Sequence, residues 1–91
     1  MAAFYTYVLA NPAGRIYVGQ TNDIERRLAE HNDPDYRGTL HTKRHPGPWR
    51  LLLAESFTTR AEAIRHEKAL KGGQGREWIR EHLLPTDAGG C

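Results

Sequence analysis

The chain has 91 residues, 38% of them hydrophobic and 26% charged, which allows one globular domain with a modest core and excludes two. The formal net charge of +2 is too small to indicate a nucleic-acid partner, so the placement of charge matters more than its total. The sequence lacks an apolar run able to cross a membrane and a secretory signal, and its single cysteine, Cys91, cannot form an internal disulfide, so we expect a cytoplasmic protein.

The first twenty residues predict a β-hairpin. Residues 4–11 are rich in aromatic and β-branched side chains, and residues 15–20 form a second short strand. Pro12-Ala13-Gly14 has turn chemistry, because Pro suits the first corner and Gly accepts a left-handed conformation.

The register of this hairpin decides whether two tyrosines can act together. A three-residue loop closed by a bulge at Gly14 places Tyr7 opposite Gly19 and Tyr17 opposite Leu9. Side chains two apart on a strand share a face, so both phenols would then project to the same side. A two-residue loop would put them on opposite faces.

A helix is predicted next, over about residues 23–32, with Asn22 and Glu25 resembling a capping box and Asp33-Pro34 ending it. Its apolar side, set by Ile24 and Leu28, also carries Arg27 and His31, whereas Arg26 and Glu30 are expected on the opposite side. An inward guanidinium must meet an anion or hydrogen-bond acceptors. Alternatively, it reaches past the sheet edge into water or pairs with a carboxylate.

The rest of the chain predicts one strand and two helices. A capping box at Thr59 and Glu62 begins the second helix, and Gly72-Gly73 ends it. The expected segments are a loop over 35–48, a central strand over 49–57, helices over 59–71 and 76–84, and a frayed tail over 85–91. The order β-β-α-β-α-α predicts a small α+β domain over residues 1–84, in which helices flank a three-stranded antiparallel sheet.

The predicted helix over residues 59–71 carries a carboxylate on its apolar side, because Glu67 falls between Ile64 and Leu70. Such a group needs a cation. One carboxylate with phosphate oxygens and waters suits Mg²⁺ or Mn²⁺. A structural ion pair of Glu67 with Arg27 or Lys71 is the alternative.

Basic residues gather in the predicted loop, where no acidic residue occurs between Gly38 and Arg50. This pattern is typical of a segment that contacts a phosphate backbone, although a basic loop that is simply exposed to solvent would have the same pattern. Two histidines of the loop lack cysteine partners at zinc-site spacing. The residues expected to contact nucleic acid are Gly19, Lys43, Arg44, Arg50 and Arg76.

Taken in order, these segments resemble the GIY-YIG endonuclease domain, and within it the short stand-alone bacterial branch (UPF0213-like). The matching segments are Tyr5-Thr6-Tyr7, Tyr17-Val18-Gly19, residues 22–32, Pro48-Trp49 and residues 62–71. Two departures stand out: Tyr5-Thr6 replaces Gly-Ile, and the late asparagine of several relatives has no counterpart within residues 72–84.

The resemblance implies a single-metal phosphodiesterase that cuts DNA, with a role in repair or recombination. Carried over by position, the catalytic residues are Tyr7, Tyr17, Arg27, His31 and Glu67, and Glu67 also holds the metal, Mg²⁺ or Mn²⁺. The substrate is expected to be branched, nicked or single-stranded DNA, reached by its shape or through a targeting protein.

Two rival functions use the same residues differently. A non-catalytic nucleic-acid-binding module would bind DNA in a salt-sensitive way through its basic residues. A protein-interaction domain would use Trp49 or Trp78 as an apolar anchor. The joint presence of two tyrosines, an arginine, a histidine and a glutamate favours the enzyme, because a binding module does not need an inward carboxylate beside phosphate.

Overall fold

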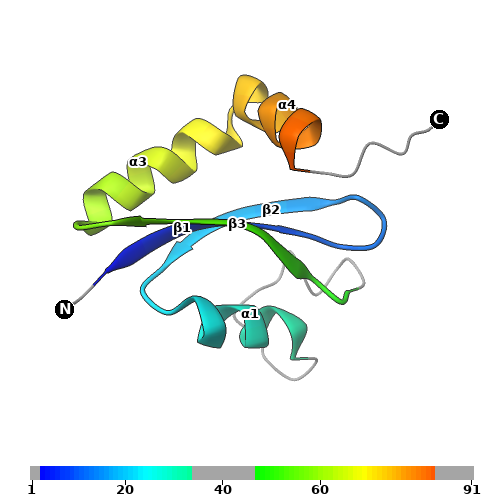
Figure 1. Ribbon diagram of the computed structural model, residues 1–91, viewed down its shortest axis with the longest axis horizontal. Helices are drawn as coiled ribbons and strands as arrows, with labels where there is room; N and C mark the ends of the chain where they lie inside the picture. The colour runs from blue at the N-terminus through cyan, green and yellow to red at the C-terminus, as the bar shows by residue number, and fades with distance from the viewer. Residues whose placement is uncertain (1–2, 34–46, 84–91) are drawn as a thin grey trace.

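A three-stranded antiparallel sheet lies between α1 on one face and α3 with α4 on the other in the computed structural model, which describes residues 3–33 and 47–83 (Figure 1). The elements are β1 (Phe4–Ala10), β2 (Ile16–Thr21), α1 (Ile24–Asn32), β3 (Arg50–Phe57), α3 (Arg60–Lys71) and α4 (Gly73–His82). The predicted α+β class and element order are confirmed. Most of the predicted loop and the tail over 85–91 with Cys91 lie outside the described residues.

The hairpin has the predicted register, with Tyr7 opposite Gly19 and Leu9 opposite Tyr17. The Asn11 N–H donates to the Arg15 carbonyl at 3.1 Å, and Gly14 has a φ of +83°, as a bulge at that position requires. Both phenols therefore project from the same face of the sheet.

The central strand is β1, and not the third strand as predicted, because the strand order is β2-β1-β3. Leu51–Ala54 is apolar enough to have suggested a central position, yet β3 is an edge strand and Leu51 is 39% exposed. The strand that is buried on both faces is instead β1, from Thr6 to Ala10.

Strand alternation divides the core into two clusters. Tyr7 and Leu9 point towards α1 and pack with Trp49, whereas Val8 points towards α3 and α4 and packs with Leu70. On that second face the Thr6 hydroxyl donates to the Ala63 carbonyl at 2.7 Å, and this hydrogen bond ties the middle strand to α3. Thr6 occupies the position where the family motif has Ile, and here its hydroxyl has a buried partner.

Two helix starts differ from the prediction. Asp23, not Asn22, caps α1 by accepting from the Arg26 N–H at 3.1 Å, because β2 continues to Thr21 and delays the helix by one residue. Helix α4 starts at Gly73, three residues earlier than predicted, because one extended residue, Gly72, is enough to separate it from α3. The capping box of Thr59 and Glu62 is confirmed.

Asn32, at the end of α1, holds the entry into β3 by two hydrogen bonds. Its amide nitrogen donates to the Trp49 carbonyl at 2.9 Å, and its amide oxygen accepts from the Trp49 N–H at 2.7 Å. Only a side-chain amide can donate and accept in this way. Asn32 therefore takes the place of a neighbouring strand at this point.

We expect Asn32→Asp to lower the free energy of unfolding by about 1–3 kcal/mol, because a carboxylate cannot donate to the Trp49 carbonyl. Urea denaturation at neutral pH measures the change. Asn22→Asp is the matched control, since Asn22 is exposed and only accepts, from Arg26, among its described contacts. Equal stability of the two variants would contradict this role for Asn32.

Candidate active site

Tyr7 lies at the centre of the candidate site and is only 2% exposed. It comes from the central strand, and its phenol oxygen is 2.9 Å from Nε2 of His31 and 3.3 Å from Nε of Arg27. Both partners come from α1, which crosses this face of the sheet. Arg27 can only donate to the phenol, whereas the phenol donates to Nε2 of His31 in the tautomer that leaves this nitrogen unprotonated, and Tyr17 hydrogen-bonds the phenol as well.

Tyr17 joins this group from the neighbouring strand. Its ring centroid lies 6.1 Å from that of Tyr7 and 4.6 Å from that of His31, which is itself buried. The four predicted residues Tyr7, Tyr17, Arg27 and His31 thus converge on the α1 face, as the hairpin register requires.

Burial raises the pKa of Tyr7 well above its usual value near 10, and the neighbouring Tyr17 adds to the rise. The hydrogen bond and the charge of Arg27 lower the pKa of Tyr7, but by less than burial raises it. Tyr7 is therefore protonated at neutral pH, and it can accept a proton only if its own proton moves elsewhere. The hydrogen bond to His31 provides that route.

Arg27 is held by two partners. Its Nη1 lies 2.9 Å from Oε1 of Glu30, and its Nε donates to Tyr7. Burial lowers the pKa of Arg27, but the hydrogen bonds to Glu30 and Tyr7 outweigh it and raise the pKa further. The expectation that Glu30 lies on the opposite side of the helix is wrong, because residues three apart are neighbours on a helix surface.

Gly19 permits the close packing of the two phenols. A Cβ atom on this residue would lie 2.7 Å from the hydroxyl oxygen of Tyr7 and 2.9 Å from Cε1 of Tyr17. These separations are too short for any side chain. The close approach expected at this glycine is thus made by the site's own tyrosines.

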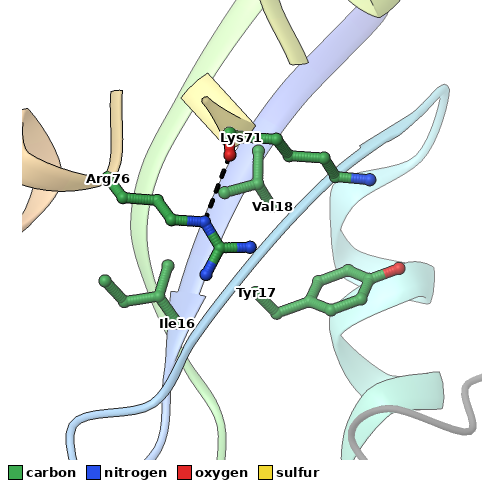
Figure 2. Close-up of a pocket in the computed structure, with 5 residues that line it drawn as sticks. All are labelled: Ile16, Tyr17, Val18, Lys71 and Arg76. Carbon is green, nitrogen blue, oxygen red and sulfur yellow. Dashed lines mark hydrogen bonds between the residues drawn. The ribbon is translucent and has the colours of Figure 1, made fainter. Parts of the chain in front are cut away.

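Glu67 lies on α3, which covers the other face of the sheet, and its side chain is 17% exposed. Its Oε2 atom lies 2.6 Å from Nζ of Lys71, so the structural ion pair considered as an alternative is present. Lys71 and Tyr17 line one pocket of about 240 Å³ at the outer edge of β2. Figure 2 shows the Lys71 ammonium and the Tyr17 hydroxyl extending in the same direction. Lys71 thus pairs with Glu67 and also lines the pocket that Tyr17 lines.

The donor atoms available fit one kind of metal site. Within residues 3–33 and 47–83, no three His, Cys, Asp or Glu side chains gather closely enough to hold an ion among them. A zinc ion held by three or four such side chains therefore has no site there. A single carboxylate such as Glu67 fits Mg²⁺ or Mn²⁺, which keep most of their waters and take further oxygens from a phosphate.

The residues predicted to contact nucleic acid are spread over the molecule. Arg76 lines the pocket shared by Tyr17 and Lys71, and its Nε donates to the Lys71 carbonyl at 3.1 Å (Figure 2). Arg50 is exposed on β3, at the opposite edge of the sheet from β2. Lys43 and Arg44 lie outside the described residues.

Three residues at the site were not predicted to belong to it: Glu30, Lys71 and Arg60. Glu30 could have been found from its i,i+3 spacing to Arg27, whereas Lys71 had been named only as a possible ion-pair partner of Glu67. Arg60 comes from a remote segment, and the sequence carries no local signal for its position.

Comparison with known proteins identifies the same family that the sequence motifs resemble. The family model described as the GIY-YIG catalytic domain matches residues 3–81. A UPF0213 protein of Bacillus licheniformis is 42% identical over 67 residues, which are 74% of this chain and 66% of that protein, slightly under two thirds of its length. The solution structure of a UPF0213 protein from Bacillus halodurans is similar with a TM-score of 0.53 and 28% identity, covering 91% of this chain and 88% of the other. That of an E. faecalis protein has a TM-score of 0.54 and 32% identity, covering 97% and 95%.

Among the described residues, none of the helices has the length and apolar character needed to cross a bilayer.

Proposed function

Because this chain belongs to the GIY-YIG family, a family of nuclease domains, we propose that it is a metal-dependent endonuclease that hydrolyses phosphodiester bonds in DNA. The observation that carries the proposal is the convergence of Tyr7, Tyr17, His31 and Arg27 on one face of the sheet. A base, a proton acceptor behind it and a fixed positive charge are what attack on a phosphate requires.

Tyr7 and His31 form the proton path. As a water attacks phosphorus, the phenol oxygen takes a proton from that water and the phenol's own proton passes to Nε2 of His31, 2.9 Å away. The raised pKa of Tyr7 makes this concerted relay necessary, because a free phenolate is too scarce at neutral pH to serve as the base. The bond to the 3′-oxygen breaks, and that oxygen is protonated by solvent.

Arg27 and Tyr17 act on the phosphate. The Arg27 guanidinium stays charged throughout, and it opposes the negative charge that grows on the phosphate oxygens. The Tyr17 hydroxyl donates a hydrogen bond to one of these oxygens. Glu67 would hold an ion, Mg²⁺ or Mn²⁺, which would supply Lewis-acid stabilisation of the phosphate and of the leaving oxygen.

For Glu67 to bind a metal, the Lys71 ammonium has to leave its position 2.6 Å from Oε2. This pair is half exposed on the Lys71 side, so solvent weakens it and little stability is lost when it opens. Lys71 then remains beside Tyr17 as a further cation for the substrate.

The test is a cleavage panel of flaps, junctions, nicked duplexes and single strands with Mg²⁺ or Mn²⁺. We expect cleavage of at least one substrate by the wild-type chain, loss of it with EDTA, and a rate about 10²- to 10⁴-fold lower for Glu67→Gln. Glu77→Gln, on the exposed side of α4, is the matched control and should cut at the wild-type rate. Salt-sensitive binding without metal-dependent cleavage of any substrate would instead establish the non-catalytic binding module.

A further inference from the structure

A second pocket, separate from that of Lys71, opens at the other end of β2. It has a volume of about 370 Å³ and lies where β2 ends, between the starts of α1 and α3. Its lining is almost wholly polar and consists of Gln20, Thr21, Asn22, Arg26, Arg27, Glu30 and Arg60. We refer to it as the arginine groove.

Three arginines face one glutamate in the arginine groove, which leaves it positively charged. Glu30 is shared between Arg27 at 2.9 Å and Arg26 at 3.8 Å, so its charge is already committed to these two. The Arg60 guanidinium lies over the ring of Phe4, 5.2 Å from its centroid, and forms no ion pair within the described part of the chain. Arg60 therefore adds a cation to the groove that no described carboxylate neutralises.

The groove is continuous with the candidate active site, because Arg27 belongs to both. Its Nε atom donates to Tyr7 on one side, and its side chain lines the groove on the other. An anion in the arginine groove would thus lie beside an anion held at Tyr7.

We propose that the arginine groove binds the phosphate adjacent to the scissile one on the same DNA strand, an inference that rests on the proposed nuclease function. Arg60 and Arg26 hold this second phosphate, and Arg27 lies between it and the reacting one. Asn22 and Gln20 offer amide groups for its oxygens or for the sugar, as is common at nucleic-acid backbones.

The two pockets set the path of the strand. The first adjoins Ile16–Val18 and the arginine groove adjoins Gln20 and Thr21, so the two follow the same unpaired edge of β2. Six strand residues span about 17 Å, whereas a DNA strand carries a phosphate every ~3.4 Å along a duplex. This edge is therefore long enough to contact several nucleotides of one strand.

The test compares two arginines of the same helix. Binding of a single-stranded DNA is measured without divalent metal, between about 50 and 200 mM salt. We expect Arg60→Gln to bind about 10-fold more weakly and to lower the slope of log K against log salt by about 0.7, the value for one lost phosphate contact on a single strand. Arg65→Gln, whose residue lines a pocket with Phe57 and His66 on the other side of α3, should match the wild type. Arg60→Lys should keep the slope.

A phosphate scan locates the contact without any change to the protein. Each phosphate of the DNA is replaced in turn by a neutral methylphosphonate, and we expect one internal position next to the cleavage site to weaken binding about 10-fold. The same replacement should have no further effect on Arg60→Gln. Dependence on a 5′-terminal phosphate alone, or full competition by inorganic phosphate, would overturn the proposal in favour of a terminal or free-phosphate site.

The two proposals can fail separately. Cleavage of DNA together with identical binding by Arg60→Gln and Arg65→Gln would overturn the arginine groove and leave the nuclease standing. Arg60-dependent binding at one internal phosphate, in a protein that cuts no substrate, would keep the groove and overturn the nuclease.

Discussion

Tyr7→Phe is expected to lower the cleavage rate by about 10²- to 10⁴-fold while the fold is retained. The substitution removes one oxygen atom, and with it the hydrogen bonds to His31 and Arg27, but it keeps the buried ring. Single-turnover cleavage at saturating protein measures the chemical step directly.

Tyr5→Phe is the control for this experiment, because Tyr5 lies on the same strand and the same face but makes none of these contacts among those described. It should cut at close to the wild-type rate. An equal loss in both variants, or a Tyr7→Phe protein as fast as the wild type, would show that the phenol oxygen has no part in the reaction.

Tyr7→Phe also has a predictable effect on stability at alkaline pH. In the unfolded chain Tyr7 ionises near pH 10, whereas in the folded chain its pKa is raised and it stays protonated. Its contribution is therefore complete below about pH 10 and is lost as the pH rises above that value. The free energy of unfolding, measured by urea denaturation at several values between about pH 9 and 11, should accordingly fall less steeply with pH for Tyr7→Phe than for the wild type.

Gly19→Ala is expected to damage both stability and activity, by about 1–3 kcal/mol and about 10²-fold respectively. The added methyl group would lie 2.7 Å from the Tyr7 hydroxyl oxygen, so at least one phenol has to move. Tyr7 is packed between β1 and α1, and Tyr17 against His31, so neither ring can shift without breaking a contact of the site.

Gly73→Ala provides the comparison, because a Cβ there meets nothing within 4 Å. In the first turn of α4 an alanine should leave stability unchanged or raise it by up to about 1 kcal/mol. Urea denaturation and the cleavage assay are run on both variants. A Gly19→Ala protein that keeps wild-type activity would mean that the reaction tolerates displacement of the tyrosines.

Local chemistry made the hairpin predictable. The loop Pro12-Ala13-Gly14 allows few conformations, and each of them dictates which residues face one another. The capping box at Thr59 is likewise set within four residues. Strand order is different in kind, because it depends on how remote segments pack. The apolar β3 therefore looked central and is an edge strand.

The same distinction explains what could be foreseen of the site. Arg27 and His31 were found because a polar residue on an apolar helical face breaks a pattern that the sequence displays. Glu67 was found in the same way, but its pairing with Lys71 remained one of several options until the structure was known. Arg60 reaches the arginine groove from the start of α3, more than thirty positions after Arg27, and only the folded chain brings them together.

The central strand has a consequence for how this protein can change over evolution. Tyr7 faces α1, while Thr6 and Val8 beside it face α3 and α4, so one short stretch of chain positions both the phenol of the candidate site and the main core. A slip of one residue in β1 would turn Tyr7 into the core and expose Val8 at the site. Selection for a well-packed interior therefore also preserves the position of the phenol, even in descendants that do not cleave DNA. An intact tyrosine in such descendants would be poor evidence of catalysis, whereas the exposed Arg60, which packing does not protect, would be free to drift.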